Sequence, residues 1–371
     1  MMNDIQLFWR IKTVSSPENI VPNFLPFEFD FNYDLQLITQ KVNKQILKYL
    51  NDIYLADSNI GYLQDTEFGI KYKSDFMKFI EAALNNHGKN VKSILEIGCG
   101  GCTILSDLKK NGYEVIGIDP SPISTVTANK ISFRIINDFF PTELFKDKVD
   151  LIYHSDVLEH IPDPVTFLKN QTKQLSDNGL IIIAVPDSSE SIALGDSSMA
   201  LHQHINYFNK ESLRNTINAA GLSIIELKNS EYGGSLYCSA KHKNNNSCEV
   251  KISQNYSIFT EKMAIQKTKI RSLVSLLKQD PHRSVGIYVP LRATPYLSDF
   301  DGIRFFDDTP GWAGNKLDGI DVKIENFESL LANPVTDLLI MTLTFDEIIR
   351  KKVHNISGIK NIITLRELLN E

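Results

Sequence analysis

An acidic residue followed by closely spaced glycines occurs in the first half of the chain, in the run Glu96-Ile-Gly98-Cys-Gly100. Because glycine has no Cβ, Gly98 and Gly100 let the backbone adopt positive φ and come close to a ligand. Asp119 follows the next apolar segment, where doubly wound sheets place a carboxylate that hydrogen-bonds ribose hydroxyls. The spacing predicts a site for a ligand that contains a nucleoside, with Glu96 placed to meet a cationic or hydroxylated group. The order E-x-G-x-G differs from the G-x-G-x-x-G of dinucleotide sites, which disfavours a nicotinamide-dependent dehydrogenase.

Two cysteines, Cys99 and Cys102, lie inside this glycine run with the spacing of a metal or redox pair. A zinc site needs about four ligands, and Cys238 and Cys248 do not form a second pair of this kind. We therefore expect the two cysteines to be incidental to the turn, and we expect no metal site in the chain.

The segments around these residues alternate between apolar runs and helical patterns. The runs that read as strands are 93–97, 113–118, 133–136, 149–154, 180–185, 222–227 and 235–240. The segments that read as helices are 75–84, 121–130, 165–175 and 211–220. Apolar strands that alternate with helices predict an α/β fold with a doubly wound, mostly parallel sheet covered on both faces.

A second α/β region is expected after a polar stretch at 241–247. A long helical pattern covers 257–278, and the last part of the chain again alternates. Its expected strands and helix are 284–289, 338–343 and 345–353. Three parts are therefore expected: a helical and mixed extension at 1–90, a ligand-binding domain at 91–245, and a linking helix with a smaller α/β domain at 246–371.

Composition and charge exclude several classes of protein. The chain has 371 residues, of which 42% are hydrophobic, and a formal net charge of -6. The negative charge argues against a general attraction for nucleic acid, and no apolar run reaches the roughly 18 residues of a membrane span. Residues 1–10 lack the pattern of a signal peptide, and the few cysteines form no disulfide framework. We expect a cytoplasmic protein with no nucleic-acid partner and no membrane span.

Four segments, in chain order, resemble the motifs of the class I S-adenosylmethionine-dependent methyltransferases. They are 95–101, 116–120, 150–164 with a Leu-Glu-His signature at 158–160, and 179–186. The resemblance implies the seven-stranded, mostly parallel sheet of that class. It also implies S-adenosylmethionine as the cofactor and methyl transfer as the reaction.

Carried over position by position, this resemblance implies a role for each matching residue. Asp119 would bind the ribose hydroxyls, and the glycine turn at 98–100 would lie under the methionine part of the cofactor. His154 and Ser155 would line the cofactor near its sulfonium. Asp138 would be a partner for the adenine amino group, with a helix cap or a surface acid as the alternative interpretation.

A narrower and looser resemblance, over residues 70–335, is to the sugar C-methyltransferases that act on nucleotide-linked deoxysugars. It rests on the segments 202–209, 233–237, 304–311 and 319–322. The resemblance implies a nucleotide-sugar acceptor and a Rossmann-like C-terminal domain. Within it, His204 matches the proposed basic residue of the subfamily, and Tyr72 aligns loosely with an acceptor-side tyrosine.

The chain departs from this subfamily at several positions. A tyrosine and a glutamate of the subfamily appear as Leu201 and Gln203, and residues 290–293 replace a glycine-rich turn. No cysteine precedes Cys99, so the N-terminal zinc module of the subfamily is absent from the sequence. The methylated atom is therefore left open: carbon, or the oxygen of a sugar hydroxyl that His204 deprotonates, since the imidazole pKa lies near working pH.

From these patterns we expect a methyltransferase that acts on a sugar or nucleotide-sugar in surface-glycan or secondary-metabolite biosynthesis, a branch of carbohydrate biosynthesis. The alternatives are a methyltransferase for another small molecule or a lipid head group, and a catalytically degenerate module that only binds the cofactor. His204 and Tyr72 are the candidate catalytic residues. Arg292 or Arg304 is a candidate anion-binding residue for a nucleotide-sugar, and a homodimer is an expected assembly.

Overall fold

The structure is a computed structural model that describes residues 5–6, 22–56, 66–88, 90–130, 132–243, 256–317 and 319–370. These residues divide into two compact units, which we call the larger unit and the smaller unit. The larger unit comprises Phe29–Asp187 and Gln203–Gln254, and the smaller unit comprises Met1–Glu28, Ser188–His202 and Asn255–Glu371. The three-part division expected from the sequence stays a prediction. Cys248 and most of the polar stretch at 241–247 lie outside the described residues.

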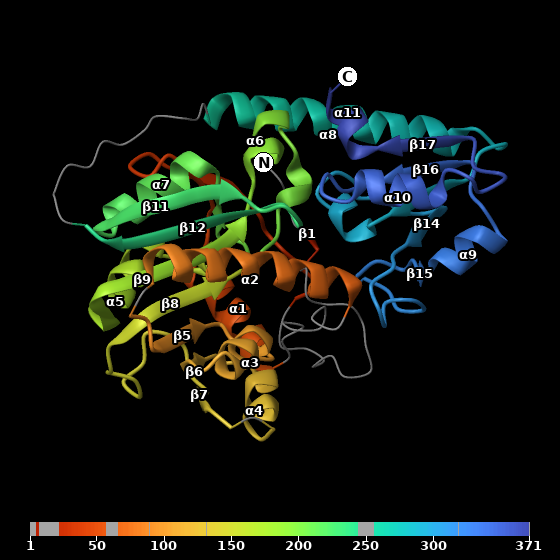
Figure 1. The fold of residues 1–371 in the computed structure, drawn as a ribbon. Coiled ribbons are helices and arrows are strands. Elements are labelled where there is room, and N and C mark those ends of the chain that lie inside the picture. Colours follow the sequence, from red (N-terminus) through yellow and green to blue (C-terminus); the bar gives the residue numbers. More distant parts are fainter. Residues whose placement is uncertain are drawn as a thin grey trace. The chain divides into compact units, whose positions relative to one another are not determined.

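A seven-stranded sheet forms the centre of the larger unit (Figure 1). Its order is β11-β12-β9-β8-β5-β6-β7, and of these strands only β12 runs antiparallel to its neighbours. The strands are β5 (Ser93–Ile97), β6 (Glu114–Ile118), β7 (Arg134–Ile136), β8 (Val149–Ser155), β9 (Leu175–Pro186), β11 (Leu222–Asn229) and β12 (Ser235–His242). This order confirms the expected doubly wound α/β fold, and it brings the carboxyl ends of β5, β6 and β8 to one edge.

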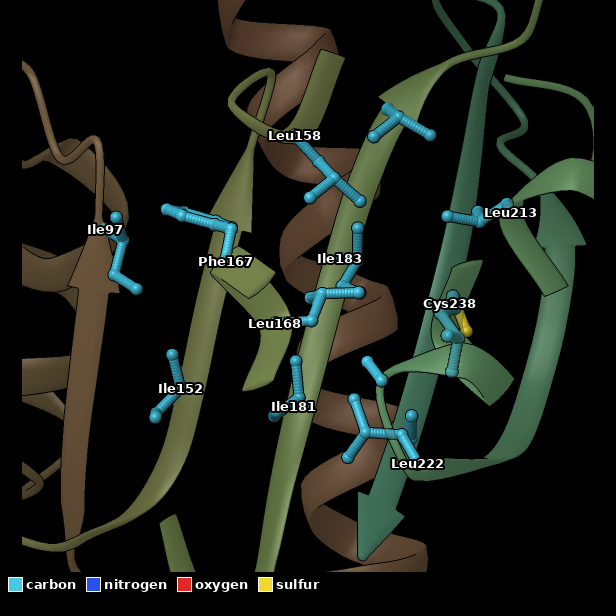
Figure 2. Packing of buried hydrophobic residues seen from close by; sticks show 14 of the residues in the cluster. Ile97, Ile152, Leu158, Phe167, Leu168, Ile181, Ile183, Leu213, Leu222 and Cys238 are labelled. Carbon is cyan, nitrogen blue, oxygen red and sulfur yellow. The ribbon is translucent and has the colours of Figure 1, made fainter. Parts of the chain in front are cut away.

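Helices cover both faces of this sheet. They are α2 (Glu67–His87), α3 (Thr103–Lys110), α4 (Pro122–Ala128), α5 (Pro164–Gln174) and α7 (Lys210–Ala219). One buried cluster includes Ile152, Ile183 and residues of α5 and α7, and another includes Leu151, Tyr153 and residues of α2 and α3. Figure 2 shows Ile152, Phe167 and Ile183 of the first cluster. Successive residues of β8 therefore point to opposite faces of the sheet, as strand geometry requires.

A three-stranded sheet lies beside the loop that carries His204. It has the order β10-β4-β3. Its strands are β3 (Phe29–Asn32), β4 (Leu37–Gln40) and β10 (Asn206–Tyr207), and α1 (Lys44–Ala56) follows β4. β10 pairs antiparallel with β4, and the Gln40 N–H donates to the Ile205 carbonyl at 2.7 Å. The N-terminal part of the larger unit thus fixes the loop directly before β10.

Five parallel strands form the centre of the smaller unit, in the order β15-β14-β13-β16-β17. They are β13 (Val285–Tyr288), β14 (Ile303–Phe306), β15 (Ile324–Glu325), β16 (Asp337–Ile340) and β17 (Asn361–Thr364). The other described strands and α-helices of this unit are β1 (Ile5–Gln6), β2 (Phe24–Leu25), α6 (Ser189–Leu194), α8 (Tyr256–Gln279), α9 (Phe327–Ala332), α10 (Asp346–Val353) and α11 (Leu365–Asn370). The strand order is that of a Rossmann half-fold and confirms the second, smaller α/β sheet.

The strands and helices that the sequence predicts from apolar residues are present in the structure. The strand expected at 93–97 is β5, residue for residue. The helix expected at 75–84 is longer, because α2 begins at Glu67 behind Thr66, whose side chain accepts from the Gly69 N–H. Among the described helices, none is both long and apolar enough to cross a membrane.

Asp75 ties α2 to the loop between β11 and β12. Its Oδ2 atom accepts hydrogen bonds from the N–H groups of Glu231 and Tyr232, at 3.0 and 3.3 Å, and from the Tyr237 hydroxyl at 3.1 Å. Asp75→Ala leaves these donors without their acceptor, so we expect the free energy of unfolding to fall by about 2–4 kcal/mol. Urea denaturation followed by circular dichroism measures this change.

Glu67→Ala is the matched control on the same helix. It removes an exposed ion pair with Lys71 and leaves the Asp75 contacts in place. Because exposed ion pairs contribute little to stability, this variant should unfold close to the wild-type chain. Equal losses in the two variants would contradict the role given to Asp75.

Candidate active site

The glycine turn bends the chain between β5 and α3. Gly98 and Gly100 have φ of 75° and 46°, and Cys102 is also left-handed, with φ of 56°. A Cβ at Gly98 would lie 2.5 Å from Cγ2 of Val157, so a larger residue does not fit without a shift of that side chain. The turn therefore presents bare backbone at the strand ends, which is what close approach of a nucleoside or amino-acid group requires.

Asp119 follows β6 and joins the glycine turn to the next turn of the chain. Its carboxylate is 2% exposed. One oxygen accepts from the Gly100 N–H at 2.7 Å, and the other accepts from the N–H of Ser121 at 2.7 Å and from the Ser121 hydroxyl. A carboxylate has about four lone-pair positions, so these three bonds leave one for a ribose hydroxyl.

Glu96 lies in β5, two residues before Gly98, and hydrogen-bonds within the protein. It is 6% exposed, and its Oε2 atom accepts from the Tyr153 hydroxyl at 2.8 Å. Burial raises the pKa of Glu96 well above its usual value, and the Cys102 thiol and the Asp119 carboxylate add to this. Glu96 is thus tied to β8 through Tyr153 and keeps a proton more readily than a surface glutamate.

His154 and Ser155 lie at the carboxyl end of β8 and differ in environment. His154 has no exposed surface, and its ring centroid lies 5.7 Å from that of Phe167. Burial lowers the pKa of His154 to about 3. The structure therefore gives no support for contact between its ring and the cofactor. Ser155 is half-buried, and its hydroxyl donates to Asp156 Oδ2 at 2.9 Å.

Asp138 follows β7 and is engaged by its own turn. The Phe139 N–H donates to its Oδ1 atom at 2.8 Å, and the Thr142 hydroxyl donates to Oδ2. These contacts are those of a turn-capping acid, the alternative interpretation of the sequence. Contact with an adenine amino group stays a prediction.

Tyr72 of α2 reaches the end of β8. Its hydroxyl donates to Asp156 Oδ2 at 2.9 Å and lies 3.0 Å from the Ser235 hydroxyl. A Cβ at Gly233 would lie 2.5 Å from Cδ2 of Tyr72, so the glycine makes room for the ring. Burial and the Asp156 carboxylate raise the pKa of Tyr72 well above its usual value. Tyr72 is therefore a neutral hydroxyl that can donate to one group and accept from another.

His204 lies beside two residues of the short 3-10 helix η1 (Leu158–His160). Its ring centroid is 5.1 Å from that of His160, whose Nδ1 atom lies 2.7 Å from the Gln203 carbonyl. Burial lowers the pKa of His160 to about 4, against the effect of the Gln203 and Asp156 carbonyls. Burial, and next the Asp156 carboxylate, raise the pKa of Glu159 well above its usual value. The described cluster is thus a buried glutamate with two imidazoles.

Two residues of this region were not singled out from the sequence. Asp156 carries the only carboxylate that Tyr72 contacts in the described part of the chain, and Glu159 lies against His160. The signal for both was present in the run Asp156-Val-Leu-Glu-His160, which follows directly after a buried strand. Acidic and histidine residues at the carboxyl end of a parallel strand are candidates for a site by position alone.

The cysteine pair is part of the turn. Cys99 and Cys102 are buried as free thiols, and Cys102 Sγ lies 3.6 Å from the Gly100 carbonyl. The Cys102 thiol and burial raise the pKa of Cys99. Cys238 lies in the other buried cluster of the sheet. Nothing in the described residues therefore adds ligands to the pair.

Arg304, a candidate phosphate ligand in the sequence, is already paired. Its guanidinium donates to both oxygens of Glu325, at 2.8 and 2.6 Å, and to the Asn333 carbonyl. Arg292 donates to the Ser198 carbonyl at 2.9 Å. The geometry of Arg304 therefore does not favour it as a ligand for a nucleotide-sugar.

Comparisons with known proteins agree with the fold of the larger unit. Residues 68–227 match a family model described as a methyltransferase domain. The ubiquinone biosynthesis O-methyltransferase of Pelagibacter ubique is 34% identical over 102 residues, which cover 26% of this chain and 42% of that protein. The protein of the same name from Rickettsia typhi is 30% identical over 155 residues, which cover 38% of this chain and 61% of that protein. The chain thus spans about half the length of these relatives.

One solved structure to which this chain is similar is the 1,6-didemethyltoxoflavin-N1-methyltransferase of Burkholderia thailandensis. The TM-score is 0.42 and the sequence identity is 16%, and the match covers 58% of this chain and 100% of that chain. The sheet order and the family match together define the class: residues 68–227 form an S-adenosylmethionine-dependent methyltransferase domain of class I. Its cofactor is S-adenosylmethionine, and the bare glycine turn beside Asp119 fits the group. The matches do not confirm the sugar C-methyltransferase subfamily, since these relatives are named for ubiquinone biosynthesis.

Asp119→Ala removes the proposed ribose acceptor and the bond that holds Gly100. We expect S-adenosylmethionine and S-adenosylhomocysteine to bind more weakly by about 1.5–3 kcal/mol, or more than about tenfold. Isothermal titration calorimetry measures the change, with the exposed Asp177→Ala as the control. Wild-type affinity in Asp119→Ala would contradict the assignment of the cofactor site.

His154 makes stability depend on pH. Its folded-state pKa is lowered to about 3, so below about 6.5, the usual value, the unfolded chain takes up a proton that the folded chain refuses. The stability that the neutral ring contributes is therefore complete above that pH and is lost as the pH falls. Relative to the wild-type chain, His154→Leu should gain about 2 kcal/mol between about pH 7 and pH 5.

Urea denaturation at the two pH values tests the effect of His154→Leu. The exposed His282 is the control position, because its ring is solvated in both states. His282→Leu should follow the wild-type chain at both pH values. The same pH dependence in His154→Leu and the wild-type chain would show that the His154 ring is not buried as described.

Proposed function

We propose that this chain transfers the methyl group of S-adenosylmethionine to the oxygen of a hydroxyl-bearing small molecule. The observation that carries the proposal is a second group of polar side chains at the edge that holds the glycine turn. It contains Tyr72 with Asp156, and His204 with Glu159 and His160. The O-methyltransferase relatives favour oxygen over carbon as the acceptor atom.

The residues proposed to hold the cofactor lie at the ends of three strands, β5, β6 and β8. Asp119 would accept from the ribose, the turn at 98–100 would take the methionine part, and Ser155 would lie near the sulfur. Glu96, which accepts a hydrogen bond from the Tyr153 hydroxyl, would lie beside the cofactor just before the turn. When bound, the cofactor supplies a methyl group on a positively charged sulfur, which keeps the electron pair of the C–S bond that breaks.

On the acceptor side, the chain must hold a hydroxyl and take its proton as the new C–O bond forms. Asp156 accepts from the Tyr72 hydroxyl, so Tyr72 keeps lone pairs that can accept from an acceptor hydroxyl. Deprotonation is assigned to the cluster of His204, His160 and Glu159, since imidazole is the usual proton acceptor near neutral pH. Tyr72 thus positions the acceptor, and the cluster around His204 activates it.

Two acceptor classes are in competition. The resemblance of 202–209 and 233–237 to sugar-modifying enzymes favours a sugar or nucleotide-sugar. The names of the relatives favour a hydroxyl on an intermediate of ubiquinone biosynthesis. The Arg304–Glu325 pair weakens the case for a nucleotide phosphate, and we therefore place free sugars and ring hydroxyls first among the acceptors to test.

Incubation with S-adenosylmethionine labelled in its methyl group tests the proposal directly. The panel contains sugars, nucleotide-sugars and hydroxylated aromatic rings, and mass spectrometry reports the transfer. Label on an oxygen of one class supports the proposal and names the acceptor class. Tight cofactor binding without transfer to any class would contradict it and favour a degenerate binding module.

Tyr72→Phe removes the hydroxyl and keeps the ring against Gly233. We expect kcat to fall by about 10–100-fold, because the acceptor is no longer aligned, while the affinity for the cofactor stays unchanged. Steady-state kinetics, with an acceptor that the labelling experiment identifies, measures kcat, and calorimetry measures the affinity for the cofactor. Tyr33→Phe, at a side chain that is 74% exposed, is the control. An unchanged kcat in Tyr72→Phe would remove Tyr72 from the acceptor site.

Assembly and location remain predictions from the sequence. A homodimer would be seen as twice the chain mass in light scattering. Cell fractionation would test the cytoplasmic location.

A further inference from the structure

Three ligand-type groups from two distant segments meet beside the end of β8. Glu159 and His160 come from η1, and His204 comes from the loop before β10. One ligand atom of each residue lies within 4.8 Å of the corresponding atoms of the others. Glu159 Oε1 and His160 Nε2 lie 3.6 Å apart, which is too long for a hydrogen bond.

The ring of His160 is oriented as metal-bound imidazoles usually are. Its Nδ1 atom lies 2.7 Å from a carbonyl oxygen, that of Gln203, so Nδ1 carries the proton. Nε2 is then left with a lone pair on the side of Glu159. Histidines that bind metals typically donate their other ring N–H to a carbonyl or carboxylate in this way.

The buried carboxylate of Glu159 also points to a bound ligand. It is 1% exposed, and neither carboxylate oxygen has a hydrogen-bond partner among the described residues. The Tyr54 hydroxyl is also buried and without a partner in that part of the chain, and its ring lies 5.9 Å from that of His160. Buried polar groups without partners are costly, so a ligand that satisfies the carboxylate is expected on physical grounds.

The backbone around the cluster is held firmly. The Ile205 N–H donates to the Glu159 carbonyl at 2.7 Å, and the Asn206 side chain donates to the carbonyls of Leu158 and Ile161 at 3.1 and 2.7 Å. These bonds join the two segments that carry the three groups. The site is therefore preorganised, as a metal site requires.

We infer that Glu159, His160 and His204 bind one divalent transition-metal ion of the Zn²⁺ type. Two imidazoles and one carboxylate are one of the protein ligand sets found in catalytic zinc sites, which keep a further position open for water or substrate. Imidazole favours Zn²⁺ and its neighbours over Mg²⁺ and Ca²⁺, which prefer oxygen. This site differs from the sequence-based expectation of no metal, which rests on the cysteines alone.

The inference deepens the proposed function, on which the role of the ion rests. An ion at this place would polarise an acceptor hydroxyl and ease the loss of its proton to water. His204 would then act as a ligand of the ion and not as the base itself. Binding of the ion can be measured without any methyl acceptor.

The test uses the full chain after treatment with a chelator and dialysis. Calorimetric titration with ZnCl₂ should show one ion per chain with micromolar or tighter affinity. Titration with Co²⁺ should give visible absorption bands typical of nitrogen and oxygen ligands, without the thiolate charge-transfer band that cysteine ligands produce. Absence of zinc binding to the folded chain would overturn the inference.

Variants locate the ion. Glu159→Gln and His204→Gln should each weaken zinc binding by at least about 100-fold, while circular dichroism and S-adenosylmethionine affinity stay at wild-type values. Zinc binding should persist in His282→Gln and in Cys99→Ala. Loss of binding in Cys99→Ala, with Glu159→Gln unaffected, would place the ion at the glycine turn and overturn the inference.

The outcomes separate this inference from the proposed function. Methyl transfer that survives the chelator, together with no zinc binding, would overturn only the metal site. Zinc binding that depends on Glu159 and His204, with no methyl transfer to any acceptor, would establish the site and overturn the proposed function. Methyl transfer that is lost on chelation and restored by Zn²⁺, but not by Mg²⁺, supports both.

Discussion

The carboxylate of Asp119 is the contact on which the cofactor site depends. It is almost completely buried and receives backbone N–H groups from two turns, one of Gly100 and one of Ser121. Hydrogen bonds to an ionised acceptor are the strong ones, and this carboxylate uses them to fix the glycine turn against the end of β6. The positive φ of Gly98 and the position of Val157, which a Cβ at Gly98 would meet, favour glycine at this point of the turn. The cofactor site is therefore preorganised by bonds within the protein.

The same sheet edge explains the acceptor side. Parallel strands present their carboxyl ends together, and the segment after β8 accordingly lies beside the glycine turn, where Val157 is next to Gly98. Tyr72 arrives from α2, which Asp75 ties to the loop before β12. His204 arrives with β10, which pairs with β4 from the N-terminal part of the larger unit. Residues far apart in the chain therefore meet because of sheet pairing.

The sequence predicted the parts of the fold whose signal is local. The apolar run at 93–97 and the glycine turn after it are recognisable without tertiary information, and so is the acid at Asp119. β4 and β10 were not predicted, because each is short and their pairing joins segments that are distant in sequence. Such long-range pairing leaves no pattern within either segment.

The roles of the candidate site residues stay predictions, and the structure shows where each side chain lies. The resemblance implies that His154 lines the cofactor, while strand alternation places its ring in the core against Phe167. The sequence does not predict Glu159 as a site residue, because its burial is defined only by the packed structure. Tyr72 was placed on the acceptor side by resemblance, and its contacts with Asp156 and Ser235 agree with that position.

Crystals grown with S-adenosylhomocysteine test whether the turn beside Asp119 is the cofactor site. We expect density for the ribose within hydrogen-bond distance of the Asp119 carboxylate, with the amino-acid part along the turn at 98–100. We also expect the sulfur to face the side of Tyr72 and Asp156, where an acceptor hydroxyl would lie. Density for the ligand elsewhere on the chain, or a sulfur turned away from Tyr72, would show that this assignment is wrong.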